Sequence, residues 1–186
     1  MACNSIRTLE YNPCVANLGG IKSVYLAEYD ADAITVKKGE GGADDTYTLK
    51  SGIKWQEYKM RKNVASMTST LNNSTDGASY VTTELALVFS RMDANKRAAI
   101  QALALGEVMA IVEDSNGELW FLGKDAPLTA TAGAGETGTA MADANRYTLT
   151  LTDESKEFPI RLADSDNPSK PSQGNGEGGS SQTPGA

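Results

Sequence analysis

Strict alternation of side chains along two segments is the feature that most constrains the fold of this chain. In a β-strand, successive side chains point to opposite faces of the sheet. The segment Tyr80–Ser90 alternates in this way over its whole length, and Tyr147–Thr152 alternates apolar residues with threonine. The pattern predicts two strands that each bury one face. In the first strand the predicted core residues are Val81, Thr83, Leu85, Leu87 and Phe89.

A short helix is predicted directly after the first of these strands. Asp93 suits the N-cap position, because its carboxylate can accept hydrogen bonds from backbone N–H groups two or three residues further on. Residues 94–104 are rich in alanine and other good helix formers, and Ile100 and Leu103 give them a narrow apolar stripe. Gly106 is placed to end the helix as a C′ glycine. A helix of about three turns is marginal alone, so we expect it to pack on a sheet.

A hairpin is predicted after the helix. The apolar segments Val108–Asp114 and Leu119–Leu122 are separated by a turn at Asn116-Gly117. This dipeptide favours a two-residue type I′ turn, which would place Val112 opposite Phe121. Apolar pairs then fall on both faces of the ribbon, so we expect both faces to be covered.

The remaining strands complete a mainly β domain. Alternating, β-branched or aromatic residues predict strands at 21–29, 34–37, 46–50, 53–60, 65–71 and 158–162. The total is about eight to ten strands and one helix. We therefore predict a β-sandwich or a partly closed barrel, with one short α-helix packed against it.

The segments outside these elements define the domain organisation. Residues 1–16 are polar and irregular and predict an extended N-terminal arm, followed by the β-domain at 17–162. Residues 39–45 predict a loop, and the Ala-, Gly- and Thr-rich residues 125–145 predict a long loop inserted in the domain. Residues 163–186 consist mainly of Ser, Gly, Pro, Asn and Gln, so we expect a disordered tail.

Composition narrows the possible functions. The 186-residue chain has no histidine, which removes His-based catalytic triads and His-ligated metals. Its net charge of −7 argues against a basic nucleic-acid-binding surface, since phosphate affinity comes mainly from Lys and Arg. Cys3 and Cys14 are too few for a disulfide framework or a zinc site. No apolar run reaches the ~20 residues that span a bilayer and no signal peptide is recognisable, so we expect a soluble protein made in the cytoplasm.

The motifs that could carry chemistry are all incomplete. Gly133–Gly138 matches Gly-x-Gly-x-x-Gly, but no predicted strand precedes it, no helix follows it, and Thr139 replaces the lysine of a phosphate-binding loop. Asp114, Asn116 and Glu118 form only a fragment of a calcium-binding loop. We therefore expect no catalytic residue, no cofactor and no metal, and we interpret the glycine-rich segment as a contact loop.

Three stretches together resemble structural proteins of tailed bacteriophages that infect Bacteroides-like bacteria. They are Leu18–Ala27 (LGGIKSVYLA), Asp114–Gly123 (DSNGELWFLG) and Asn145–Thr152 (NRYTLTLT). Combined with the predicted architecture, the chain is similar to the tail-tube and connector-ring group, whose members are β-sandwiches flanked by a helix that stack as rings.

The resemblance implies a non-enzymatic virion protein, made in the host bacterial cytoplasm, that assembles with itself. In a tail tube the copies would form rings, such as hexamers, around a channel through which DNA passes without specific binding. A head–tail connector or a capsid decoration protein is the alternative within this class, and each role involves other virion proteins but no membrane. Because loops and arms reach neighbouring subunits in this group, the interface candidates are Gly39, Asp45, Leu128, Gly133, Gly135, Gly138 and Met141.

A function of another class is also compatible with the residues. Trp55 or Trp120 could serve as a stacking platform for sugars in a monomeric carbohydrate-binding β-sandwich module. Burial of these aromatic side chains as strand anchors is the simpler interpretation. The oligomeric state separates the two functions, because a virion subunit has to self-associate and the module does not.

Overall fold

The computed structural model describes residues 14, 16–37, 46–59, 61, 64–163 and 166–168. These residues form eleven strands and one helix. The predicted loop at 39–45 and most of the predicted arm and tail lie outside the described residues. In chain order the elements are β1 (Ile21–Glu28), β2 (Ile34–Lys37), β3 (Thr46–Leu49), β4 (Gln56–Tyr58), β5 (Ser66–Asn73), β6 (Ser79–Ser90), α1 (Ala94–Leu105), β7 (Val108–Asp114), β8 (Leu119–Leu122), β9 (Thr129–Glu136), β10 (Arg146–Ser155) and β11 (Ile160–Leu162).

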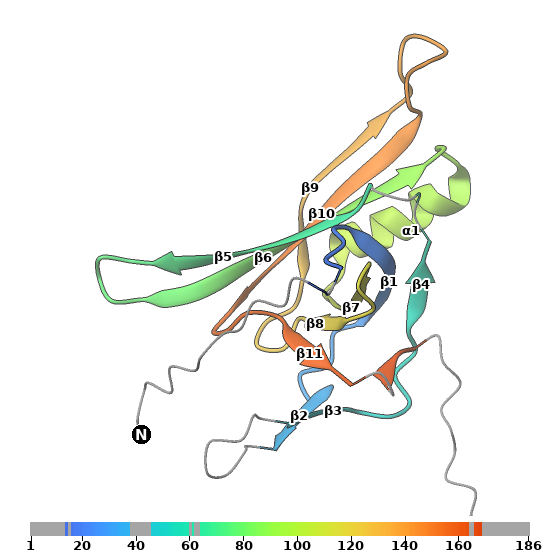
Figure 1. The fold of residues 1–186 in the computed structure, drawn as a ribbon. Coiled ribbons are helices and arrows are strands. Elements are labelled where there is room, and N and C mark those ends of the chain that lie inside the picture. The colour runs from blue at the N-terminus through green and yellow to red at the C-terminus, as the bar shows by residue number, and fades with distance from the viewer. Residues whose placement is uncertain are drawn as a thin grey trace, which may run out of the picture.

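The strands form three sheets, and the mainly β fold predicted from the sequence is confirmed (Figure 1). The body sheet has the strand order β11-β8-β7-β1-β4, the hairpin sheet has the order β5-β6-β10-β9, and β2 pairs with β3 in a two-stranded cover sheet. None of the three closes on itself, so the architecture is a sandwich of open sheets and not a barrel.

The body sheet is buried on both faces. Within β7, Met109, Ala110, Ile111 and Val112 are each 0% exposed. One face contributes Val24, Ala110 and Val112 to a core shared with the hairpin sheet, and the other contributes Tyr25, Ile111 and Phe121 to a core beneath the cover sheet. The expectation that both faces of the β7–β8 ribbon are covered is therefore confirmed.

Strand β6 has the predicted faces. Leu85 and Leu87 are 0% and 1% exposed, whereas Glu84, directly before Leu85, is exposed. The neighbouring strand β10 pairs with β6 over its full length, from Arg146 opposite Ser90 to Ser155 opposite Val81. These two central strands therefore fix the geometry of the hairpin sheet.

Helix α1 begins as the sequence predicts but ends differently. The backbone N–H of Lys96 donates a 2.8 Å hydrogen bond to the Asp93 carboxylate, so Asp93 is the N-cap. Leu103 is buried between the two larger sheets, with Ile100 packed beside it. Gly106 has φ −98° and ψ 165°, so it does not adopt the left-handed conformation of a C′ glycine. A Cβ at Gly106 would lie 3.0 Å from the carbonyl oxygen of Ala102, so close packing explains this glycine better.

The β7–β8 hairpin forms, but its predicted register is wrong by one residue. Val112 lies opposite Trp120, because Asp114 pairs with Glu118 and leaves a three-residue loop. The Asp114 carboxylate accepts hydrogen bonds from the backbone N–H groups of Asn116 (2.8 Å) and Glu118 (3.0 Å). Gly117 has φ +90°, while Asn116 does not have the positive φ that a type I′ turn requires. The side chain of Asp114 therefore selects a longer turn than Asn116-Gly117 alone would favour.

The largest correction concerns the segment predicted as a long loop at 125–145. Residues Thr129–Glu136 form strand β9, which pairs with β10 from Thr129 opposite Thr152 to Glu136 opposite Arg146. Its Ala, Gly and Thr side chains carry little apolar surface, so the hydrogen bonds to β10 and not burial hold it in the sheet. This extra strand raises the total to eleven.

Two hairpins extend from the hairpin sheet. The β5–β6 hairpin projects to the left in Figure 1, and the β9–β10 hairpin projects to the upper right, past α1. In the turn of the β9–β10 hairpin, Met141 is fully exposed. At the other end of the described chain Asn167 is only 6% exposed, so the start of the predicted tail still packs on the body at that residue.

Replacing Leu87 by Ala should lower the free energy of unfolding by about 2–5 kcal/mol, because it leaves a cavity between the two larger sheets. Urea denaturation followed by circular dichroism measures the loss. Val88→Ala, on the partly exposed opposite face of β6, is the matched control and should cost clearly less. Equal losses for the two variants would contradict the assignment of the two faces.

Candidate subunit interface

The interface residues predicted from the sequence fall mostly on one hairpin. Leu128 directly precedes β9, Gly133 and Gly135 lie within it, and Gly138 and Met141 lie in the turn that leads to β10. Gly39 and Asp45 lie outside the described residues. The β9–β10 hairpin is therefore the candidate site for contact with another subunit. The five described candidate residues have different structural roles.

Leu128 is a core residue of its own subunit. Its side chain is 0% exposed and belongs to the cluster between the body sheet and the hairpin sheet. Its backbone exchanges two hydrogen bonds with Val108, at 2.8 and 3.1 Å. The prediction that Leu128 contacts a neighbouring subunit is therefore not supported by its position, since no surface of this side chain is available to a partner.

Gly133 and Gly135 serve packing inside the subunit. They lie opposite Leu149 and Tyr147, whose side chains cover the inner face of β9. A Cβ at Gly135 would lie 2.9 Å from Cε1 of Tyr147 and 3.1 Å from Cε of Met92, so only glycine leaves room for both groups. The first two glycines of the Gly-x-Gly-x-x-Gly match thus lie in a strand, where the missing side chains leave space for Leu149, Tyr147 and Met92.

The turn at the end of the hairpin is held in shape by one carboxylate. Asp143 accepts hydrogen bonds from the backbone N–H of Thr139 (2.8 Å), the hydroxyl of Thr139 (3.0 Å) and the backbone N–H of Ala140 (2.7 Å). The backbone N–H groups of Ala140 and Thr139 hold the pKa of Asp143 below its ordinary value. Gly138 has φ +73°, and a Cβ there would lie 2.4 Å from Cβ of Asp143. The turn is therefore a defined structure that requires both Gly138 and Asp143.

Met141 is presented by this turn without any cover from its own subunit. Its relative exposure is 106%, the highest among the large hydrophobic residues exposed on the described surface. Single exposed apolar residues are common on protein surfaces, but a methionine at the end of a hairpin held by three hydrogen bonds is positioned for a partner. Of the five described candidates, Met141 is the one whose side chain can reach another molecule.

The edges of the hairpin sheet are a second feature suited to contact. Within the described chain, β5 and β9 each pair on one side only. The backbone N–H and C=O groups along their other sides are therefore available to a strand of another chain. Neither edge carries proline, and the short side chains of β9 would not obstruct such pairing.

The outer face of the hairpin sheet, turned away from the body sheet, is polar. Its central positions are small or hydroxyl-bearing and partly exposed: Thr82, Ala86, Val88, Thr148, Thr150 and Thr152. Glu84 and Glu154 add exposed carboxylates, and Arg146 is paired with Glu136 at 3.0 Å. The unpaired charge on this face is therefore negative.

A buried carboxylate joins the two larger sheets near the other end of β10. Asp153 is 4% exposed, and its Oδ2 accepts a 3.0 Å hydrogen bond from the backbone N–H of Gly123, directly after β8. Its Oδ1 has no hydrogen-bond partner. Burial raises the pKa of Asp153, and the hydrogen bond from Gly123 offsets only part of that effect. From the sequence, Asp153 and Glu154 are interpreted as surface carboxylates; for Asp153 this is wrong, because it continues the core face of Leu149 and Leu151 and the two sheets cover it.

The remaining candidate residues are engaged in packing or in turns. The Trp55 ring packs edge-on against Phe121, with 6.5 Å between the ring centroids. The indole N–H of Trp120 donates a 3.1 Å hydrogen bond to the Asp114 carboxylate, whose other oxygen is occupied by the turn. In the part of the chain that the structure describes, no group of three or more His, Cys, Asp or Glu side chains is arranged to bind a metal ion.

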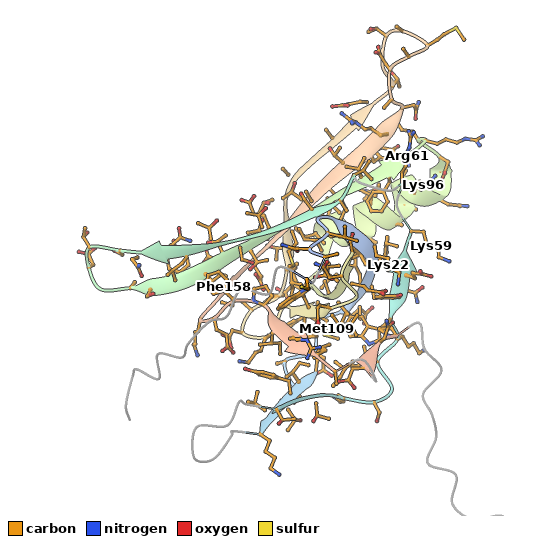
Figure 2. All side chains as sticks on the ribbon, in the orientation of Figure 1. Lys22, Lys59, Arg61, Lys96, Met109 and Phe158 are labelled. Carbon is orange, nitrogen blue, oxygen red and sulfur yellow. The ribbon has the colours of Figure 1, made fainter. Side chains whose placement is uncertain are left out.

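Figure 2 adds the distribution of the labelled side chains. Met109 lies in the interior, whereas Lys59, Arg61 and Lys96 lie together on the side of the molecule formed by β4 and α1. Among the described residues no helix is long and apolar enough to cross a membrane.

Comparison of the chain with protein-family models, curated proteins and solved structures finds no match. The function has therefore to be argued from the sheet, its edges and its hairpins.

Replacing Gly135 by Val should destabilise the subunit by about 1–3 kcal/mol, since the new side chain must displace Tyr147 and Met92. Thermal melting monitored by circular dichroism provides the measurement. Ala134→Val is the matched control, because Ala134 is exposed on the opposite face of the same strand and valine favours β-structure. A neutral result for Gly135→Val would mean that the inner face of β9 is not packed as described.

The buried Asp153 predicts an unusual pH dependence of stability. An Asp whose pKa is raised in the folded state stabilises the fold below its unfolded pKa, and this contribution is lost as pH rises through the folded pKa. Asp153→Asn should therefore melt at a higher temperature than the natural chain at pH 7, with the difference shrinking as pH falls toward 4. Glu154→Gln, next to it on the exposed face, should show no such trend, and an advantage for Asp153→Asn that is independent of pH would contradict the assignment.

Proposed function

We propose that this chain is a non-enzymatic virion subunit that assembles with copies of itself into rings, as a tail-tube protein that encloses a channel for DNA. The observation that carries the proposal is the hairpin sheet, which has two unpaired edges and two projecting hairpins in the described chain. A monomeric domain normally covers or blunts such edges. Here the edge strands are long enough to pair with other copies, at eight residues each.

The two edges support a closed assembly. The strand β9 of one copy can lie beside β5 of the next, which continues the four-stranded sheet from subunit to subunit. Such a contact uses two different surfaces of each subunit, and contacts of this type form rings when the rotation between copies closes. The twist of the sheet supplies a rotation at every step. Ring size then depends on the angle between neighbouring copies.

The outer face of the hairpin sheet suits the lining of a channel. Its threonine hydroxyls can form hydrogen bonds with water, and its small side chains offer little surface to which DNA could bind. Its unpaired charges come from Glu84 and Glu154. An acidic lining repels the phosphate backbone, so DNA could pass without binding. The overall charge of −7 favours the same role. The body sheet, cover sheet and α1 would then form the outside of the ring.

Two other roles are alternatives. A head–tail connector or a capsid decoration protein would use the same self-association, with the hairpins directed at other virion proteins. A monomeric carbohydrate-binding module is the alternative of another class, and it is less favoured because the rings of Trp55 and Trp120 are both used in packing within the subunit. No specific observation favours an enzyme.

Assembly at high protein concentration is the expected outcome of a direct test. Light scattering after size exclusion should give a mass that rises with concentration, and negative-stain microscopy should show rings or tubes with a central channel. A chain that remains monomeric at every concentration would overturn the proposal. Binding to a glycan panel by such a monomer would favour the carbohydrate-binding module.

Proline substitutions at two neighbouring positions of β9 test the edge contact itself. Consecutive residues of an antiparallel strand direct their N–H groups to opposite sides, so either Gly133 or Ala134 donates toward β10 and the other donates toward the open edge. Of Gly133→Pro and Ala134→Pro, one should destabilise the subunit, and the other should keep its melting temperature but reduce assembly. If the stable variant assembles like the natural chain, the edge of β9 is not the contact.

A further inference from the structure

A hollow on the described surface lies beside α1. It has a volume of about 940 Å³ and lies between the second half of α1, the end of β1 and residues 50–58. Its inner wall is apolar, with Leu26, Leu103, Val108 and Tyr58, its helical wall carries the small residues Ala99 and Ala102, and its border is polar. Burial raises the pKa of Tyr58. We refer to this hollow as the α1 cleft.

The turn of the β9–β10 hairpin has a shape that complements the α1 cleft. It presents Met141 between Ala140 and Ala142, so its end is apolar and slim. Its backbone is fixed by the hydrogen bonds to Asp143, which lowers the entropy lost on binding. The hairpin points away from the body of its own subunit in Figure 1, so a cleft that receives this turn belongs to another copy.

We propose that Met141 and the turn around it insert into the α1 cleft of a second copy of this chain. The inference rests on the proposed self-assembly and adds a second contact to that of the strand edges: an apolar projection on one side of the subunit and a hollow with an apolar inner wall on another. A methionine side chain is unbranched and flexible, so it can adapt to the hollow between α1 and Tyr58. A chain that carries both surfaces forms a head-to-tail contact, which leads to rings or to filaments.

Charges at the borders of the two surfaces are complementary. Arg91 lies at the base of the hairpin, where its backbone N–H donates a 2.7 Å hydrogen bond to Asn145. Its guanidinium is exposed and has no partner among the described residues. The α1 cleft is bordered by Glu28, Glu107 and Lys54 and by the Lys50–Asp30 ion pair, so its unpaired border charges are negative by one. With Met141 in the cleft, Arg91 would face this negative border across the contact, and this pairing would favour the head-to-tail arrangement over others.

Two variants that each block one half of the contact provide the test. Met141→Asp places a charge on the projection, and Ala102→Trp fills the cleft from an exposed position of α1. Each variant alone should weaken association about tenfold or more, as expected for a central contact of an interface. Mixed together, the two variants still supply one intact projection and one intact cleft, so the mixture should associate more tightly than either variant alone.

Matched controls separate this contact from general effects on the surface. Gln101→Trp adds the same ring to an exposed position of α1 that does not line the cleft, and Phe158→Asp removes another exposed apolar residue, outside both edge strands. Both controls should assemble like the natural chain. Circular dichroism melting of all four variants verifies that each one folds. Analytical ultracentrifugation of each variant and of the mixture measures association.

A covalent trap gives an independent measurement. In a chain with Cys3→Ser and Cys14→Ser, the pair Met141→Cys and Ala102→Cys should yield disulfide-linked ladders under mild oxidation. If the natural chain assembles but neither blocking variant reduces assembly, and no ladder forms, the inference is wrong while the proposed function stands. If the natural chain does not assemble at all, the proposed function itself fails.

Discussion

Burial of the body sheet on both faces is the constraint on which the rest of this structure depends. Strands β1 and β7 place apolar side chains on both sides, and Met109 to Val112 are fully buried. A sheet of this kind needs a cover on each face, because each exposed apolar face would remain in contact with water. The hairpin sheet with Leu103 of α1 covers one face, and the cover sheet covers the other. The three layers of the fold thus follow from the apolar side chains on both faces of β1 and β7.

The same constraint explains why the hairpin sheet is free to serve assembly. Only one of its faces is needed as a cover, so the opposite face can remain polar and its strands can extend beyond the body. The edge strands β5 and β9 each pair on one side only and keep unpaired backbone groups in the described chain. In the proposed function this division is useful, because the body provides stability while the edges, outer face and hairpins provide the contacts with other copies.

Prediction from the sequence succeeded where a local pattern decides the outcome. Alternation located β6 and β10 and their core faces, and the N-cap at Asp93 located the start of α1. It failed where the decision depends on a partner. The sequence predicts a loop in place of β9, although Thr129 to Gly135 alternate alanine with threonine or glycine, because such small side chains give no apolar signal. Leu128 is an interface candidate from the sequence but is buried, because residues from distant segments cover it in the core.

The sequence by itself determined which residues form strands, where the helix starts, and that the chain is mainly β, because these properties depend on neighbours within a few residues. Tertiary structure alone decided the pairing of β9 with β10, the register of β7 on β8 and the burial of Asp153. It also brought the second half of α1, the end of β1 and residues 50–58 together around the α1 cleft. It set the direction in which the β9–β10 hairpin projects. These features depend on hydrogen bonds and packing between residues far apart in sequence, whose energies are decided only when all the layers are assembled.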